Sequence, residues 1–176
     1  MLKRRLIPKL QLSLRSSFRG PQPVLAVTRQ FGSRRPMGDP LSQAKIYEAQ
    51  LADELLLVDI DRTEESWSLL LATLEIMADA LATPLAVGGG VRSFEQVQNL
   101  LDRGADKVVL NSAALDSPKL VDVVANSYGA QCVVLSLDAR PDSQGGWRVW
   151  GACGSKDSGR DALQWSREVV DRGAGE

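Results

Sequence analysis

Residues 84–110, PLAVGGGVRSFEQVQNLLDRGADKVVL, contain one complete strand–helix–strand unit. Pro84–Val87 and Lys107–Leu110 are short, largely apolar runs that predict buried strands. Ser93–Arg103 repeats its apolar residues at helical spacing, and Ser93 with Gln96 three residues later is a typical helix start. Apolar strands that alternate with helices are typical of a parallel sheet covered on both faces. This stretch therefore predicts an α/β fold.

The same alternation continues on both sides of this stretch. Further strands are expected at Arg5–Leu12, Glu54–Ile60 and Cys132–Leu137, further helices at about Glu64–Leu81, Ser117–Ser127 and Asp161–Asp171, and a small hairpin around Trp147–Trp150. Five strand–helix units are then complete, and Ala174–Glu176 begins a sixth strand. The pattern fits either a five-stranded open sheet or an incomplete eightfold barrel, since a full barrel takes about 250 residues. We expect one domain over residues 1–176, with residues 13–37 as a long basic loop.

The composition excludes several kinds of site. The chain has 176 residues, 44% hydrophobic and 24% charged, enough for one packed domain. It contains no histidine, which excludes Ser-His-Asp and Cys-His catalysis and histidine-ligated metals. Cys132 and Cys153 form neither a CxxC pair nor a disulfide framework, which favours a reduced, cytoplasmic setting. No apolar run approaches the roughly 20 residues of a membrane span.

The charges are unevenly distributed. Residues 1–38 carry nine Lys/Arg and no acidic residue, whereas the rest of the chain carries all 22 acidic residues. Such a segment resembles a mitochondrial transit peptide, but Pro8 lies within Arg5–Leu12 and would break an amphipathic helix. Two interpretations remain open: a loop that faces an anionic ligand such as a phosphate ester, or a solvated surface loop.

Polar or glycine residues follow the predicted strands where each one ends. They are Gln11, Asp59, Asp61, Gly88–Gly90, Asn111, Ser112 and Asp138. Ligands of parallel α/β folds bind at this edge, so the series predicts a site, although a single such residue could also cap a helix. The glycines would let backbone N–H groups approach an oxyanion, or form an ordinary turn. Asp138 is the best candidate for an acid–base group; the alternative is a structural aspartate that caps a helix or forms a salt bridge, for example with Arg140.

The opposite edge carries charges of alternating sign. Arg5, Glu54, Lys107 and Glu176 stand at the starts of the first, second, fourth and sixth strands. They could form a ring of ion pairs that closes the floor of a barrel, or a gate and docking face for a partner. The spacing does not choose between these.

Several of these stretches together resemble one enzyme family, the HisF cyclase subunits of imidazole glycerol phosphate synthase. They are residues 5–8 (RLIP), 38–40 (GDP), 53–60 (DELLLVDI), 84–92 (PLAVGGGVR), 104–114 (GADKVVLNSAA), 129–140 (GAQCVVLSLDAR) and 172–176 (RGAGE). The resemblance implies an incomplete (βα)8 TIM barrel that stops after about two thirds of the family's fold. It also implies a HisH-type glutaminase partner whose ammonia passes through the barrel to a phosphorylated substrate. The products would be imidazole glycerol phosphate and an aminoimidazole carboxamide ribotide, in histidine biosynthesis, with no metal or organic cofactor.

The resemblance also assigns expected roles to single residues. It makes Asp138 an acid–base aspartate, Gly89, Gly90 and Asn111 neighbours of a substrate phosphate, Asp59 a carboxylate lining the site, and Arg5, Glu54, Lys107 and Glu176 the ammonia gate at the partner face. Residues 38–40 would end a long mobile first loop that folds over the substrate.

Two departures from the family pattern stand beside these matches. Gln11 occupies the place of the family's second acid–base aspartate, and Lys9 that of its cysteine. A glutamine there is more similar to HisF-type paralogues that supply ammonia for amidine or amido-sugar formation in surface-glycan (O-antigen) biosynthesis. The second departure is the missing last third of the barrel, which carries other phosphate-binding loops. A half-barrel that binds the glutaminase without catalysis is the remaining alternative.

Overall fold

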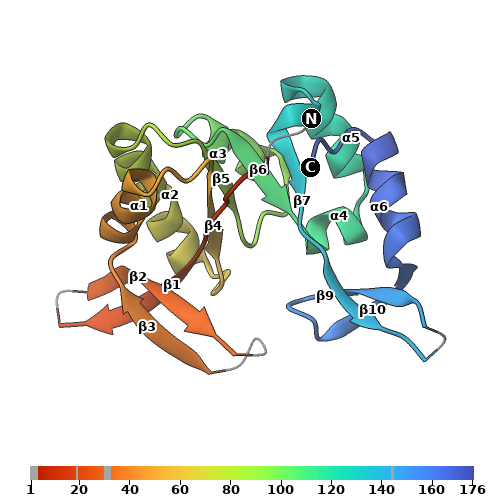
Figure 1. Ribbon diagram of the computed structural model, residues 1–176, viewed down its shortest axis with the longest axis horizontal. Coiled ribbons are helices and arrows are strands. Elements are labelled where there is room, and N and C mark those ends of the chain that lie inside the picture. The colour runs from red at the N-terminus through yellow and green to blue at the C-terminus, as the bar shows by residue number, and fades with distance from the viewer. Residues whose placement is uncertain (1–3, 19, 30–32, 144) are drawn as a thin grey trace. The chain divides into compact units, whose positions relative to one another are not determined.

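The computed structural model describes residues 4–18, 20–29, 33–143 and 145–176 (Figure 1). The strand order of the main sheet is β3-β2-β1-β4-β5-β6-β7, and a second sheet has the order β10-β9-β8. The chain forms two compact units, one of residues 1–90 and 98–108 and the other of residues 91–97 and 109–176. We describe each unit by itself.

The first unit is a sheet whose parallel part carries helices. Its elements are β1 (Lys9–Ser17), β2 (Gly20–Thr28), β3 (Arg34–Gly38), α1 (Pro40–Ala49), β4 (Leu55–Asp59), α2 (Glu64–Ala80), β5 (Leu85–Gly88), the second half of α3 (Phe94–Leu101) and the first half of β6 (Lys107–Leu110). β1, β4 and β5 are parallel, with Gln11 opposite Val58 and Val58 opposite Gly88. The strand–helix alternation expected from residues 54–110 is confirmed.

Local signals explain where these helices begin. The Asp39 side chain accepts a hydrogen bond from the Ser42 N–H at 2.8 Å, and Pro40 follows it at the first helical position of α1. Thr63 and Ser66 form a reciprocal capping box at the start of α2. The Ser93 hydroxyl accepts from the Gln96 N–H at 3.3 Å, so the predicted cap is confirmed. Leu55 and Leu57 of β4 and Leu70, Leu74 and Met77 of α2 are fully buried.

The N-terminal segment differs from the expectation. The first strand begins at Lys9 rather than Arg5 and continues to Ser17, and residues 13–37 contain the antiparallel strands β2 and β3 where we expected a loop (Figure 1). Proline in a strand removes a donor, and this obscured β2 in the sequence. Pro21 and Pro23 are tolerated because they lie in the half of β2 that pairs with β1 alone; β3 pairs with residues 25–28.

The second unit combines a strand–helix unit with a small antiparallel sheet. Its elements are the first half of α3, the end of β6, α4 (Ser112–Asp116), α5 (Lys119–Tyr128), a 3-10 turn (Ala130–Cys132), β7 (Val133–Leu135), β8 (Asp138–Pro141), β9 (Trp147–Gly151), β10 (Lys156–Asp161) and α6 (Ala162–Asp171). The hairpin predicted around Trp147–Trp150 is confirmed: these residues lie in β9, which pairs antiparallel with β8. The short helix α4 was not expected.

The chain end pairs with β7. The Gly175 N–H donates to the Val133 carbonyl at 3.0 Å, and the Leu135 N–H donates to the Glu176 carbonyl at 2.8 Å. The backbone of residues 175–176 therefore lies beside β7, at the place where the sequence predicted the start of a further strand.

Candidate functional site

At the end of β4, the Asp59 carboxylate organises the turn into α2. Asp59 is 1% exposed. Its Oδ1 accepts from the Asp61 N–H at 2.9 Å, and its Oδ2 accepts from the Arg62 N–H at 3.1 Å and the Ser66 hydroxyl at 2.6 Å. Burial raises the pKa of Asp59, while the hydrogen bonds from Ser66 and Arg62 act in the opposite direction. Both carboxylate oxygens are thus engaged in holding this turn.

The glycine turn after β5 lies directly against Asp59. Gly89 has a φ of +101°, and a Cβ atom there would lie 2.2 Å from the Asp59 carbonyl oxygen. Gly90 has a φ of +74° and approaches the Arg62 side chain. Gly89 is therefore required by backbone packing in addition to any role toward a ligand. The structure brings Asp59, Gly89 and Gly90 together, as expected.

The end of β1 contributes Gln11, which contacts β2. Gln11 is half-buried, and the Thr28 hydroxyl donates to its Oε1 at 3.2 Å. Its neighbours on the sheet are the β4 residues Val58 and Asp59, opposite Gln11 and Leu12 respectively. Gln11 thus stands at the same end of the parallel strands as Asp59 and Gly89.

Asp61, expected with Asp59 at the end of β4, lies in a polar cluster whose other members, Ser13 and Arg34, were not predicted as part of the site. The Asp61 Oδ2 accepts from the Ser13 hydroxyl at 2.9 Å and the Leu14 N–H at 2.5 Å, and its Oδ1 pairs with the Arg34 guanidinium. Arg34 also donates to the Ile60 carbonyl at 3.3 Å. The signal for Arg34 was its place in an arginine-rich segment that has no acidic residue of its own.

In the second unit, Asp138 is held by Asn111. The Asn111 Nδ2 donates to the Asp138 Oδ2 at 3.1 Å, and Asp138 is half-buried as the first residue of β8. The Asn111 Oδ1 is buried and has no hydrogen-bond partner among the described residues. The alternative pairing of Asp138 with Arg140 is wrong, because Arg140 donates to the Gly154 carbonyl and lies over the Trp150 ring. The site therefore has one carboxylate with an amide donor and an unfilled acceptor beside it.

At the start of the strands, Glu54 gathers two cations. Its Oε2 lies 2.7 Å from the Lys107 Nζ and 3.3 Å from the Arg5 Nη1, and Glu54 is 5% exposed. Three of the four predicted edge charges therefore meet in the first unit. Glu176 belongs to the second unit, where its backbone pairs with β7.

Comparison with known proteins supports the family resemblance. A family model described as "Histidine biosynthesis protein" matches residues 19–176. A Prochlorococcus marinus (strain MIT 9313) protein, provisionally named imidazole glycerol phosphate synthase subunit hisF2, is 61% identical over 176 residues, which are 100% of this chain and 67% of that protein. This chain belongs to the HisF family.

Further relatives carry the HisF name. The imidazole glycerol phosphate synthase subunit HisF of Gluconacetobacter diazotrophicus is 42% identical over 176 residues, and that of Caulobacter vibrioides (strain NA1000 / CB15N) is 41% identical over 177. Each alignment covers 100% of this chain and 65% of the relative. The HisF-family chain therefore spans about two thirds of the length of these relatives. The mixed α/β fold with a parallel sheet fits a partial (βα)8 barrel, the fold of this family.

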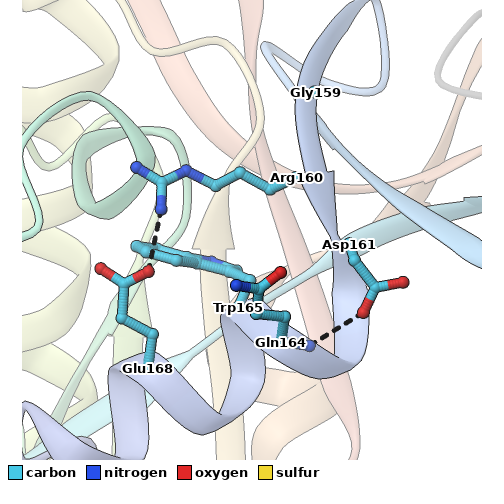
Figure 2. Close-up of a pocket in the computed structure, with 6 residues that line it drawn as sticks. All are labelled: Gly159, Arg160, Asp161, Gln164, Trp165 and Glu168. Carbon is cyan, nitrogen blue, oxygen red and sulfur yellow. Dashed lines mark hydrogen bonds and ion pairs between the residues drawn. The ribbon is translucent and has the colours of Figure 1, made fainter.

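The HisF-family chain also has a pocket on α6 that contains none of the predicted site residues. Its cavity volume is about 170 Å³, and it is lined by Gly159, Arg160, Asp161, Gln164, Trp165 and Glu168. Figure 2 shows the Arg160 guanidinium over the Trp165 ring, 4.3 Å from its centroid, and paired with Glu168 at 3.0 Å. The Arg160 side chain thus occupies the position over Trp165 that a ligand ring would need.

The described residues provide neither a metal-binding cluster nor a membrane-spanning helix. No group of three or more Cys, Asp or Glu side chains in residues 4–18, 20–29, 33–143 and 145–176 is arranged to hold a metal ion. None of the helices in that part of the chain is long and apolar enough to cross a membrane.

Proposed function

We propose that this chain forms the acid–base part of an imidazole glycerol phosphate synthase cyclase site. In this reaction ammonia and a phosphoribulosyl-formimino ribotide yield imidazole glycerol phosphate and an aminoimidazole carboxamide ribotide. The observation that carries the proposal is the Asp138 carboxylate, held by Asn111 beyond the ends of β6 and β7. Membership of the HisF family supports the substrate class.

Asp138 is the group that moves a proton in this proposal. A carboxylate can take a proton from the attacking nitrogen and return it to a leaving group, and the chain has no histidine to do so. The Asn111 N–H fixes the carboxylate, and the buried Asn111 Oδ1 offers an acceptor to an N–H of ammonia or substrate. Asn111 is a positioning residue for Asp138 and a neighbour of the bound nitrogen.

We infer that Gln11 lowers the rate relative to an enzyme that has an acid–base aspartate at this position. An amide can orient a substrate by hydrogen bonds but cannot transfer a proton, and loss of one acid–base group typically costs about 10²–10⁴ in rate. Thr28 donates to the Gln11 oxygen, which leaves the amide N–H groups to face a substrate acceptor. We therefore assign substrate orientation to Gln11.

The glycine turn and Asp59 are assigned to phosphate binding together. Gly89 and Gly90 can present backbone N–H groups to an oxyanion without side chains in the way. Asp59 supports this turn from beneath, since Gly89 packs on its backbone and both its carboxylate oxygens are occupied by the β4–α2 turn. Its contribution to the phosphate site is therefore indirect.

The charges around Glu54 are assigned to the face that binds a HisH-type glutaminase. Arg5, Glu54, Lys107 and Glu176 would form the gate through which ammonia enters. The ion pairs of Glu54 with Arg5 and Lys107 support a charged cluster at this edge of the first unit.

The substitution Asp138→Asn tests the proposal. In the full-length protein with its glutaminase, we expect ammonia-dependent formation of imidazole glycerol phosphate to fall by about 10²–10⁴, because an amide cannot carry the proton. Binding of the glutaminase should remain. The matched control is Asp157→Asn in β10, where an Asn oxygen can still accept the Gly159 N–H. Wild-type turnover by the Asp138 variant would disprove the acid–base assignment.

A further inference from the structure

Lys9 and Gln11 lie on the same face of the parallel sheet. Alternate residues of a strand share a face, and Leu10 between them, only 3% exposed, points to the other face. On the neighbouring strand β4, Leu56 is opposite Lys9 and Val58 is opposite Gln11. Lys9 is exposed, and the other three residues are half-buried. We call Lys9, Gln11, Leu56 and Val58 the open face of the sheet.

The Lys9 ammonium has no hydrogen-bond or ion-pair partner in the part of the chain that the structure describes. The acidic residue nearest to it along β4 is Glu54, two residues before Leu56. The Glu54 Oε2 already lies 2.7 Å from the Lys107 Nζ and 3.3 Å from the Arg5 Nη1. Leu56, directly opposite Lys9, has no side-chain acceptor. The flexible four-carbon stem of Lys9 can therefore move its ammonium along the open face.

Gln11 stands at the ligand end of β1 and cannot transfer a proton, because its side chain is an amide. The carboxylates that follow β4 are already engaged: Asp59 holds the β4–α2 turn, and Asp61 pairs with Arg34. Lys9 is two residues from Gln11 on the same face, which is about 7 Å along the strand. The lysine stem can span most of this distance. Lys9 can thus bring a proton to a substrate that Gln11 orients.

We propose that Lys9 is a second catalytic residue, which donates the proton that Gln11 cannot supply. The proposal rests on the proposed function, because it takes Gln11 to orient the substrate. When ammonia adds to a ketone, a C–N bond forms, the C=O π bond breaks, and Asp138 moves one proton from nitrogen to oxygen. The Lys9 ammonium then gives this oxygen its second proton, and the C–O bond breaks to release water.

The proton balance of this step closes through the solvent. As water leaves, nitrogen loses a further proton to Asp138 and a C=N bond forms. Lys9 is then a neutral amine and Asp138 a neutral acid. Lys9 is exposed, so it recovers a proton from water, and Asp138 releases one. No oxidant, reductant or other reactant is consumed.

A double-mutant cycle on the full-length protein with its glutaminase tests this role. We expect Lys9→Met and Lys9→Arg each to lower ammonia-dependent turnover by about 10²–10⁴, since a guanidinium keeps the charge but does not release a proton. In the Gln11→Asp background an aspartate can donate the proton, so the loss on Lys9→Met should shrink to less than about tenfold. Full turnover by Lys9→Arg, or equal losses in both backgrounds, would overturn the proposal.

The matched control for turnover is Lys45→Met. Lys45 is an exposed lysine on α1, outside the open face, and we expect this variant to keep wild-type turnover. If Asp138→Asn kept full turnover while the Lys9 variants lost it, Lys9 would stand and the proposed acid–base role of Asp138 would fail. If Lys9→Met kept full turnover while Asp138→Asn lost it, the reverse would hold.

A chemical footprint tests the position of Lys9 without relying on turnover. Lysines would be methylated with formaldehyde and cyanoborohydride, with and without imidazole glycerol phosphate, and quantified by mass spectrometry. At about ten times its Kd the product leaves roughly a tenth of the sites free, so methylation of Lys9 should slow by about tenfold. Methylation of Lys45 should not change. Equal methylation of Lys9 with and without product would contradict the proposal.

Discussion

Gly89 has to be glycine because its backbone packs directly against the backbone of Asp59. A Cβ atom would meet the Asp59 carbonyl oxygen at 2.2 Å, and the φ of +101° is itself unfavourable for alanine. We expect Gly89→Ala to lower the free energy of unfolding by about 3 kcal/mol or more, as measured by urea denaturation. Gly145→Ala is the control, because Gly145 has a φ of +82° and nothing within 4 Å of its added Cβ. That variant should lose only about 1–2 kcal/mol. Equal losses would show that the contact with Asp59 is unimportant.

Asp59 gives the stability of the protein a pH dependence of defined sign. Burial raises its pKa in the folded state, so the folded state binds a proton more readily than the unfolded state. This contribution to stability is present at low pH and is lost as pH rises from about 4 through the folded pKa. The difference in unfolding free energy between the wild type and Asp59→Asn should therefore decrease over that range. A difference that is constant with pH would contradict the assignment, since other carboxylates cancel in the comparison.

Among the elements, the antiparallel ribbon β2–β3 is held by its backbone pairing and additionally by one ion pair. Arg34 of β3 pairs with Asp61, which also binds Ser13 and Leu14 of β1. Arg34 is 44% exposed, so we expect a modest effect: Arg34→Gln should speed amide hydrogen exchange in β3 by about twofold to fivefold. Arg35→Gln, at the next position of the same exposed strand, should leave exchange unchanged. Equal rates in both variants would mean that the ion pair does not hold the ribbon.

The elements also differ in how far local sequence determines them. α2 and α3 were predictable because their caps and apolar faces lie within the same few residues. The ribbon was not, because its alternation is interrupted by Pro21 and Pro23 and its position is set by Asp61, about 27 residues beyond Arg34. β7 is shorter than predicted, since Gly129, with a φ of +90°, precedes a 3-10 turn that includes Cys132.

At the scale of the whole molecule, the sequence was informative about which residues end strands and less so about their contacts. Asn111 and Asp138 were expected at one edge and are hydrogen-bonded. The engagement of Asp59 by Ser66 and the crossing of Arg34 to Asp61 depend on turns whose geometry no local pattern specifies. The roles of the site residues in catalysis stay predictions until the substitutions above are made.

The Asp61 side chain has one more consequence, for how this protein can change over evolution. The parallel pairing of β1 with β4 ends at Leu12, and the Leu14 N–H, which would otherwise continue it, is taken by Asp61. The register of the parallel strands is therefore independent of the segment that follows, which is the end of β1 with β2 and β3. Insertions or deletions between Arg15 and Pro36 can change the length of this antiparallel segment and leave the parallel strands in register. This is therefore the segment to exchange when a new specificity is grafted onto the protein.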